Sequence, residues 1–134
     1  MNVFPDPVPD LRDASRSGVY ALDAARRPAL EAAARDTDSR MHVIDLTDAH
    51  DKDALLRRFA EALHFPDWFG HNWDALADCL DDLAWLEPAA ARVLALWGLT
   101  PALREPLLEI CEEACTRWRA RGMAIWVVVT EDAA

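Results

Sequence analysis

The chain has 134 residues, 52% of them hydrophobic, and its 24 acidic and 14 basic side chains give a formal net charge of −10. This composition predicts one globular domain and argues against disorder. The negative charge repels nucleic acid and anionic membranes, so neither is an expected partner, and it attracts basic proteins. No apolar run reaches membrane-spanning length and the first residues do not resemble a secretory signal, which predicts a cytoplasmic protein.

The amino-terminal part predicts an arm followed by a strand and a helix. Residues 1–17 are rich in proline and are predicted to be extended and weakly ordered. An apolar run at 18–22 predicts an edge strand, and an alanine-rich stretch at 28–35 predicts a helix that begins at a proline. We therefore divide the chain into an arm, 1–17, and a single domain, 18–134.

The middle of the chain predicts one strand and two helices. Residues 41–46 form an apolar run typical of a buried strand, and Thr47 or Asp48 can cap the helix that follows. Apolar side chains recur at helical spacing over residues 52–63, and a second helix is predicted over 72–85.

The carboxyl-terminal part predicts a strand at 92–97, a long helix with its apolar stripe at 107–120 and a central strand at 125–130. Either Pro101 or Pro106 can mark the start of that helix. Strands that alternate with helices and are apolar throughout indicate an α/β fold with a small, mainly parallel sheet covered by helices and joined by right-handed crossovers. We expect three core strands and one additional strand near the amino terminus.

The helix at 72–85 has two unlike faces. Asn72 suits its N-cap because the amide oxygen can accept from free N–H groups of the first turn. Apolar side chains share one face, namely Trp73, Leu76, Cys79, Leu80, Leu83 and Ala84. Four aspartates share the other with Ala77 and Trp85, namely Asp74, Asp78, Asp81 and Asp82. Between Phe59 and Ala91 the chain has seven acidic residues and no Lys or Arg, so the acidity is local.

Two enzymatic interpretations of this helix are weaker than a binding role. Acid–base catalysis needs carboxyl groups in unlike environments, whereas these share one exposed face. A metal site could use His71, Asp74 and Asp78, which lie at spacings of three and four, but spacing alone is weak evidence. The three cysteines, odd in number, suit neither disulfides nor a CxxC site, and we expect buried thiols.

A solvated helix face is the alternative to a binding surface. The aspartates have no Lys or Arg four residues away, and aromatic side chains, Trp68 and Trp85 with Phe69, lie beside them. Uncompensated acid next to aromatic anchors is typical of a surface that binds a basic partner. This pattern favours an interface.

The segment FPDWFGHNWDALADCLDDL, at 65–83, resembles the barstar family of ribonuclease inhibitors, whose signature joins an aromatic pair, Gly, Asn and a D-A-L-x-D-C-L helix. The resemblance covers 41–130 and implies a barstar-like fold, with 18–40 as an additional strand and helix. It implies an acidic helix that enters the cleft of a small basic ribonuclease. Barnase–barstar is itself the standard case of electrostatic steering, so that property is implied here by analogy.

The family's pattern implies a partner-binding surface on the loop and the acidic helix. Its members in this sequence are Trp68, Gly70, His71, Asn72, Asp74, Ala77, Asp78, Asp81 and Asp82. Asp78 matches the central aspartate and Trp68 the aromatic that covers the nuclease's catalytic groups. Ala77 replaces a tryptophan, and Arg117 stands where the family has an interface glutamate.

The resemblance predicts an inhibitor without turnover or cofactor, whose partner is a small basic, barnase-like ribonuclease or a related toxin. The alternative is an immunity protein or regulatory module that uses the same fold on another basic protein. A metal-dependent enzyme that uses Asp and His is the third hypothesis.

Overall fold

Four parallel strands form the sheet in the computed structural model of the protein, which describes residues 8–131. The strands are β1 (Val19–Asp23), β2 (Arg40–Asp45), β3 (Ala91–Trp97) and β4 (Ala124–Glu131), in the order β1-β4-β3-β2. All three pairs of neighbours are parallel. The predicted α/β class with a parallel sheet is confirmed, and the apolar run of β4 is central while β1 lies at an edge, as predicted.

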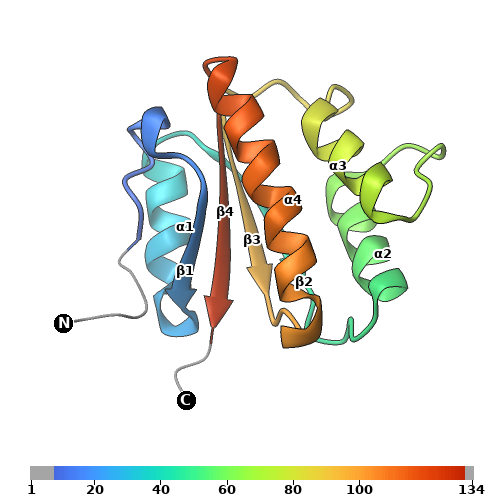
Figure 1. Ribbon diagram of the computed structural model, residues 1–134. Coiled ribbons are helices and arrows are strands. Elements are labelled where there is room, and N and C mark those ends of the chain that lie inside the picture. The colour runs from blue at the N-terminus through green and yellow to red at the C-terminus, as the bar shows by residue number, and fades with distance from the viewer. Residues whose placement is uncertain (1–7, 132–134) are drawn as a thin grey trace.

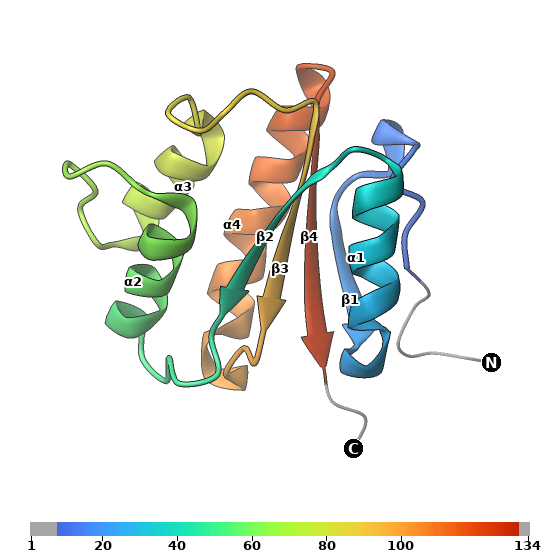
Figure 2. The ribbon, with the colours of Figure 1, turned by 180° about the vertical axis from the view of Figure 1, so that it is seen from behind.

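Helices cover both faces of this sheet. They are α1 (Arg27–Asp36), α2 (Lys52–Leu63), α3 (Trp73–Asp82) and α4 (Pro101–Ala120). Two 3-10 turns, Ala14–Arg16 and Ala24–Arg26, lie near the amino-terminal end of the described chain. Figures 1 and 2 show α1 on one face and α4 on the other, with α2 and α3 on the side of α4. The acidic helix α3 is therefore an outer element, packed along α4.

Helix starts follow the capping residues, with one correction to the predictions. Asp51, not Thr47 or Asp48, caps α2, since its Oδ1 accepts from the backbone N–H of Ala54 at 2.8 Å. Helix α4 begins at Pro101, the earlier of the two prolines that could mark its start, and Pro106 lies inside it. Pro106 is the sixth residue of α4 and lacks the N–H that would bond to the carbonyl of Ala102, but the helix continues past it.

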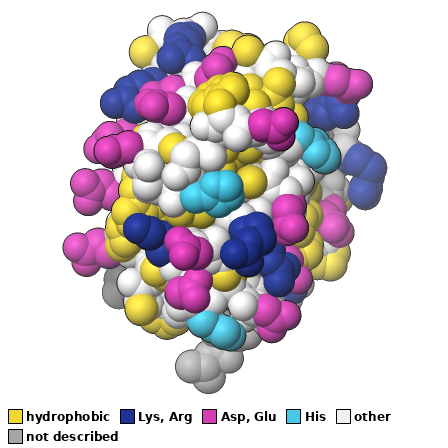
Figure 3. All heavy atoms as spheres, turned by 90° about the vertical axis from the view of Figure 1, so that its right-hand side faces the viewer, with side chains coloured by type: hydrophobic (Ala, Val, Ile, Leu, Met, Phe, Trp, Pro, Cys, Tyr) yellow, Lys and Arg dark blue, Asp and Glu magenta, His cyan; other side chains and the backbone are white. Residues whose placement is uncertain are grey.

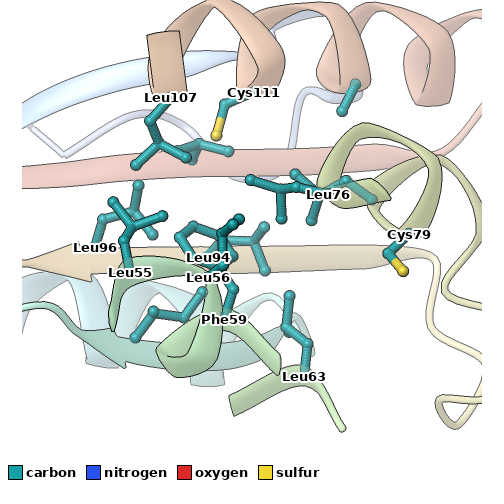
Figure 4. Packing of buried hydrophobic residues seen from close by; sticks show 14 of the residues in the cluster. Leu55, Leu56, Phe59, Leu63, Leu76, Cys79, Leu94, Leu96, Leu107 and Cys111 are labelled. Atoms are coloured by element: carbon teal, nitrogen blue, oxygen red, sulfur yellow. The ribbon is translucent and has the colours of Figure 1, made fainter. Parts of the chain in front are cut away.

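The larger core lies between the sheet and helices α2, α3 and α4. Figure 4 shows Leu56 and Phe59 of α2 beside Leu94 of β3. Leu76 of α3 and Leu107 of α4 belong to the same buried cluster. A second cluster on the other face joins Trp126 to the α1 side chains. Because both faces of β3 and β4 are covered, their side chains are buried on each side, which explains their continuous apolar runs.

The predicted arm is only partly within the described residues. Residues 1–7 lie outside them. From residue 8 onward the segment is not simply extended, because it includes the turn at Ala14–Arg16 and buries Leu11 in the core beneath α1. That residues 18–134 form one separate domain stays a prediction.

The three cysteines are free and buried. Burial raises the pKa of Cys79 to about 11 and that of Cys115 to about 12, and it also raises the pKa of Cys111. A thiol with so high a pKa is almost entirely protonated at neutral pH and is a poor nucleophile. These cysteines act as small core side chains.

Candidate functional site

Asn72 fixes the start of α3 and connects it to the preceding loop. Its Oδ1 accepts from the backbone N–H of Ala75 at 2.7 Å, and its Nδ2 donates to the carbonyl of Gly70 at 3.4 Å. Gly70 has no positive φ, and a Cβ there would meet Asn72 Nδ2 at 3.4 Å. The predicted N-cap is confirmed, and one amide side chain holds both sides of the junction.

The end of α3 corrects the prediction. The helix stops at Asp82, three residues earlier than expected, and Leu83 adopts the left-handed conformation with φ 50°. This turn buries Leu83 and carries Trp85 away from the acidic face, where it was predicted to lie. Trp85 is half-buried instead, and its Nε1 donates to the carbonyl of Leu63 at 2.8 Å, at the carboxyl end of α2.

Helix α4 holds the carboxyl end of α3. Trp118 Nε1 donates to the carbonyl of Leu80 at 2.7 Å, and Arg121 Nη1 donates to the carbonyl of Asp81 at 2.8 Å. The Arg121 guanidinium also lies over the Trp118 ring, 4.7 Å from its centroid. These contacts satisfy carbonyls that a helix end leaves without partners, so α3 is fixed at both ends.

Three of the four predicted aspartates, Asp74, Asp78 and Asp82, form an exposed row along α3, which we call the acidic column. Their spacing of four places them one above another on the helix. Among the described residues, none of the three makes an ion pair, and Asp82 only accepts from the backbone N–H of Ala84. The column therefore carries uncompensated negative charge.

Asp81 does not belong to this column and is partly buried, whereas the sequence predicted it on the same exposed face. Its part in a binding surface stays a prediction. Asp81 turns toward α4, where its Oδ2 accepts from Arg117 Nη1 at 2.9 Å. Arg117 also lies 3.7 Å from Glu113, one turn earlier on α4. The helix has no cation four residues from Asp81, but one comes from a segment far along the chain.

Aromatic side chains of the loop before α3 form one cluster with Trp85, which follows α3. Phe69 is buried, contrary to its predicted place beside the charges, and its ring lies 4.8 Å from that of Phe65. The ring centroids of Phe65 and Trp85 are 5.9 Å apart, and those of Trp85 and Trp68 are 6.2 Å apart, with both pairs in edge-on geometry. Trp68 is 62% exposed, whereas Trp85, whose ring it contacts, is half-buried. A supported, exposed tryptophan offers apolar contact area at low entropic cost.

The remaining predicted residues are His71, in the loop before α3, and Ala77, on α3 itself. His71 is exposed at the turn before Asn72, with φ 54°, and its ring lies 4.8 Å from that of Phe69. Ala77 is half-buried on α3 between Asp74 and Asp78. Figure 3 views this side of the molecule and shows acidic side chains beside exposed apolar surface, with histidines nearby.

A metal centre receives no support. Within residues 8–131 no group of three or more His, Cys, Asp or Glu side chains could hold a metal ion, so the hypothesis built on His71, Asp74 and Asp78 lacks a site. None of the helices in that range has the length and apolar character that a membrane span requires.

The fold and this surface define a class: a parallel α/β protein that presents a capped acidic helix and a supported tryptophan. The chain belongs to the barstar family, whose model, described as "Barstar (barnase inhibitor)", matches residues 39–130. This confirms the resemblance found in the sequence and the barstar-like fold. The comparison with curated proteins returned no match. Strand β1 and helix α1 lie before the matched region.

Sequence reasoning missed a group of basic side chains at the amino ends of β2 and β3, which includes the buried Arg92. Arg92 is the first residue of the apolar strand predicted at 92–97, and nothing in that local pattern indicates that its side chain joins other basic groups. The strand register, which places Arg40 directly beside Arg92, is the signal that could have found the group, but register requires the tertiary fold.

Proposed function

We propose that this chain inhibits a small basic ribonuclease by covering its RNA-binding cleft with the acidic column and Trp68. Membership of the barstar family supports inhibition of a barnase-type ribonuclease or a related role. The observation that carries the finer proposal is the acidic column itself. Three exposed carboxylates that no cation of the described chain pairs with repel one another, and that cost is offset when a basic partner supplies the missing charge.

The proposed mechanism is competition with RNA. The carboxylates of Asp74 and Asp78 would stand where the phosphates of RNA bind, while Trp68 covers the edge of the cleft. Asn72 and the α4 contacts hold the helix in place before binding, so little conformational entropy is lost in the complex. The net charge of −10 speeds encounter with a cationic enzyme. Neither turnover nor a cofactor is required, and we place this activity in the cytoplasm.

The proposal is tested by RNA cleavage with a panel of small basic microbial ribonucleases, each titrated with the purified chain at low and at physiological salt. We expect a one-to-one endpoint with at least one enzyme. Inhibition should weaken as salt rises, because screening reduces the attraction between exposed charges. A panel in which no enzyme is inhibited at low salt would contradict the proposal.

The ion pair between Arg117 and Asp81 favours a second candidate, an immunity protein for a related toxin. Arg117 is 49% exposed at the border of the acidic column, where the family has an interface glutamate. A partner that accepts this cation would have an acidic or neutral rim at that point. Ala77, in place of the family's tryptophan, also reduces the contact area offered.

Arg117→Gln distinguishes the two candidates. Against a ribonuclease with a basic rim, we expect inhibition to tighten several-fold, since the variant removes a repelling charge and releases the carboxylate of Asp81. Against a toxin with an acidic rim, inhibition should weaken instead. Stability should fall by no more than about 1 kcal/mol, as expected for an exposed ion pair. Inhibition constants and urea unfolding measure both effects.

A further inference from the structure

A surface cavity of about 420 Å³ has neither Trp68 nor a member of the acidic column among its described lining residues, although Trp85, whose ring contacts that of Trp68, forms part of its wall. It is lined by Arg40, His42, His64, Trp85, Leu86, Glu87 and Arg92, and we call it the basic pocket. In a chain with a net charge of −10, one cavity with two arginines and two histidines is unexpected.

Arg92 is the most informative of these residues. It is only 7% exposed, yet among the described residues no carboxylate lies within 4 Å of its guanidinium. Its Nη2 donates to the backbone carbonyl of Glu87, and its Nη1 lies 3.1 Å from Nε2 of His42. Both partners are neutral. A buried cation is usually paired with a negative charge, so Arg92 lacks the counterion that its burial calls for.

The single carboxylate in the pocket does not fill that need. Glu87 forms an ion pair with Arg40, which lies directly beside Arg92 in the β2–β3 register. The two arginines and Glu87 leave one positive charge in the pocket. Four basic groups thus converge from three elements: β2, β3 and the residue that follows α2.

His42 shows how the cations act on one another. Because Arg92 can only donate, Nε2 of His42 must accept, which requires a neutral imidazole. Burial lowers the pKa of His42 below its ordinary 6.5, and the charges of Arg92, Arg40 and His64 lower it further. Glu87 is the only acid lining the pocket and is engaged by Arg40. An added anion would relieve these repulsions.

We infer that the basic pocket binds a phosphate group, either inorganic phosphate or the phosphomonoester of a small ligand. Guanidinium groups bind such oxyanions through paired N–H donors, and donors from several directions suit a tetrahedral group with several acceptor oxygens. An anion also suits a site whose two arginines are only partly balanced by Glu87. The cavity is in the size range of small-ligand sites, and Trp85 and Leu86 give it an apolar wall.

Calorimetric titration of the full chain with inorganic phosphate tests this, with chloride at equal ionic strength as the reference. We expect saturable one-to-one binding that Arg40→Gln and His64→Ala each weaken at least tenfold. Both residues are exposed, so these variants should fold. Arg57→Gln, an exposed arginine on α2 outside the pocket, should bind phosphate unchanged. Absence of saturable binding, or equal loss in Arg57→Gln, would overturn the inference.

Two further measurements distinguish a phosphomonoester ligand from free phosphate and test whether the anion binds next to His42. A nucleoside monophosphate that binds at least tenfold tighter than inorganic phosphate identifies a phosphomonoester ligand, whereas equal affinity identifies free phosphate. In NMR titration, the pKa of His42 should rise by a measurable shift when phosphate is bound. An unchanged pKa of His42, or binding of single-stranded RNA without any binding of phosphate, would rule out the site.

Discussion

Replacing Asp78 with alanine should weaken inhibition of the target ribonuclease by at least ~30-fold, which corresponds to about 2 kcal/mol. A loss of about 2 kcal/mol is the general threshold for an interface hot spot, and the barnase–barstar pair is itself a standard example of one. Asp78 is the middle member of the acidic column and makes no ion pair with any residue of the described range 8–131. Its removal therefore takes away a contact with the partner and none within the protein.

The same variant should be more stable than the parent by roughly 0.5 kcal/mol. Asp78 lies four residues from both Asp74 and Asp82, and each like-charge pair at this spacing costs a few tenths of a kcal/mol. Alanine is also a better helix former than aspartate. Weaker inhibition together with higher stability identifies a residue retained for binding, a result that a merely solvated helix face would not give.

Asp36→Ala is the matched control. It removes the same carboxylate from an exposed position on α1, at the opposite face of the sheet, and changes the net charge equally. We expect its inhibition constant to stay within about twofold of the parent, and the salt dependence of inhibition to flatten only in Asp78→Ala. Equal losses in both variants would show that net charge, and not the acidic column, drives inhibition.

Local signals in the sequence predicted the elements that position this site. Asn72 is followed by a helical apolar stripe, and a side-chain cap needs only neighbouring residues, so the start of α3 was correct. The strands were found because burial on both faces makes their apolar runs continuous. The order of strands and helices followed from the same patterns.

Contacts between distant segments set the features that could not be predicted. Asp81 and Arg117 are 36 residues apart, and only the packing of α3 along α4 brings them together. The left-handed turn at Leu83 ends α3 because it buries that leucine, a gain that depends on the core and not on helix propensity. The charge of a surface is thus read correctly from sequence only where no distant helix supplies the counterion.

Leu76→Ala should lower the free energy of unfolding by ~2–5 kcal/mol, the range for large-to-small changes in a core. Leu76 is fully buried on α3 and faces α2 and β3 side chains in the larger core (Figure 4). The truncation leaves a cavity beneath the helix that carries the acidic column. Urea unfolding of the variant and parent measures the loss.

The same variant tests whether the core face of α3 affects stability without affecting inhibition. Because Asn72 caps the helix and α4 binds its carboxyl end, the acidic column should keep its position in those Leu76→Ala molecules that are folded. At a temperature where the variant remains folded, we expect its inhibition constant to change by less than about fivefold. Leu76→Met, which nearly conserves volume, should cost under ~1.5 kcal/mol. A large loss of inhibition in folded Leu76→Ala would mean that core packing, and not the capping contacts, holds the column in place.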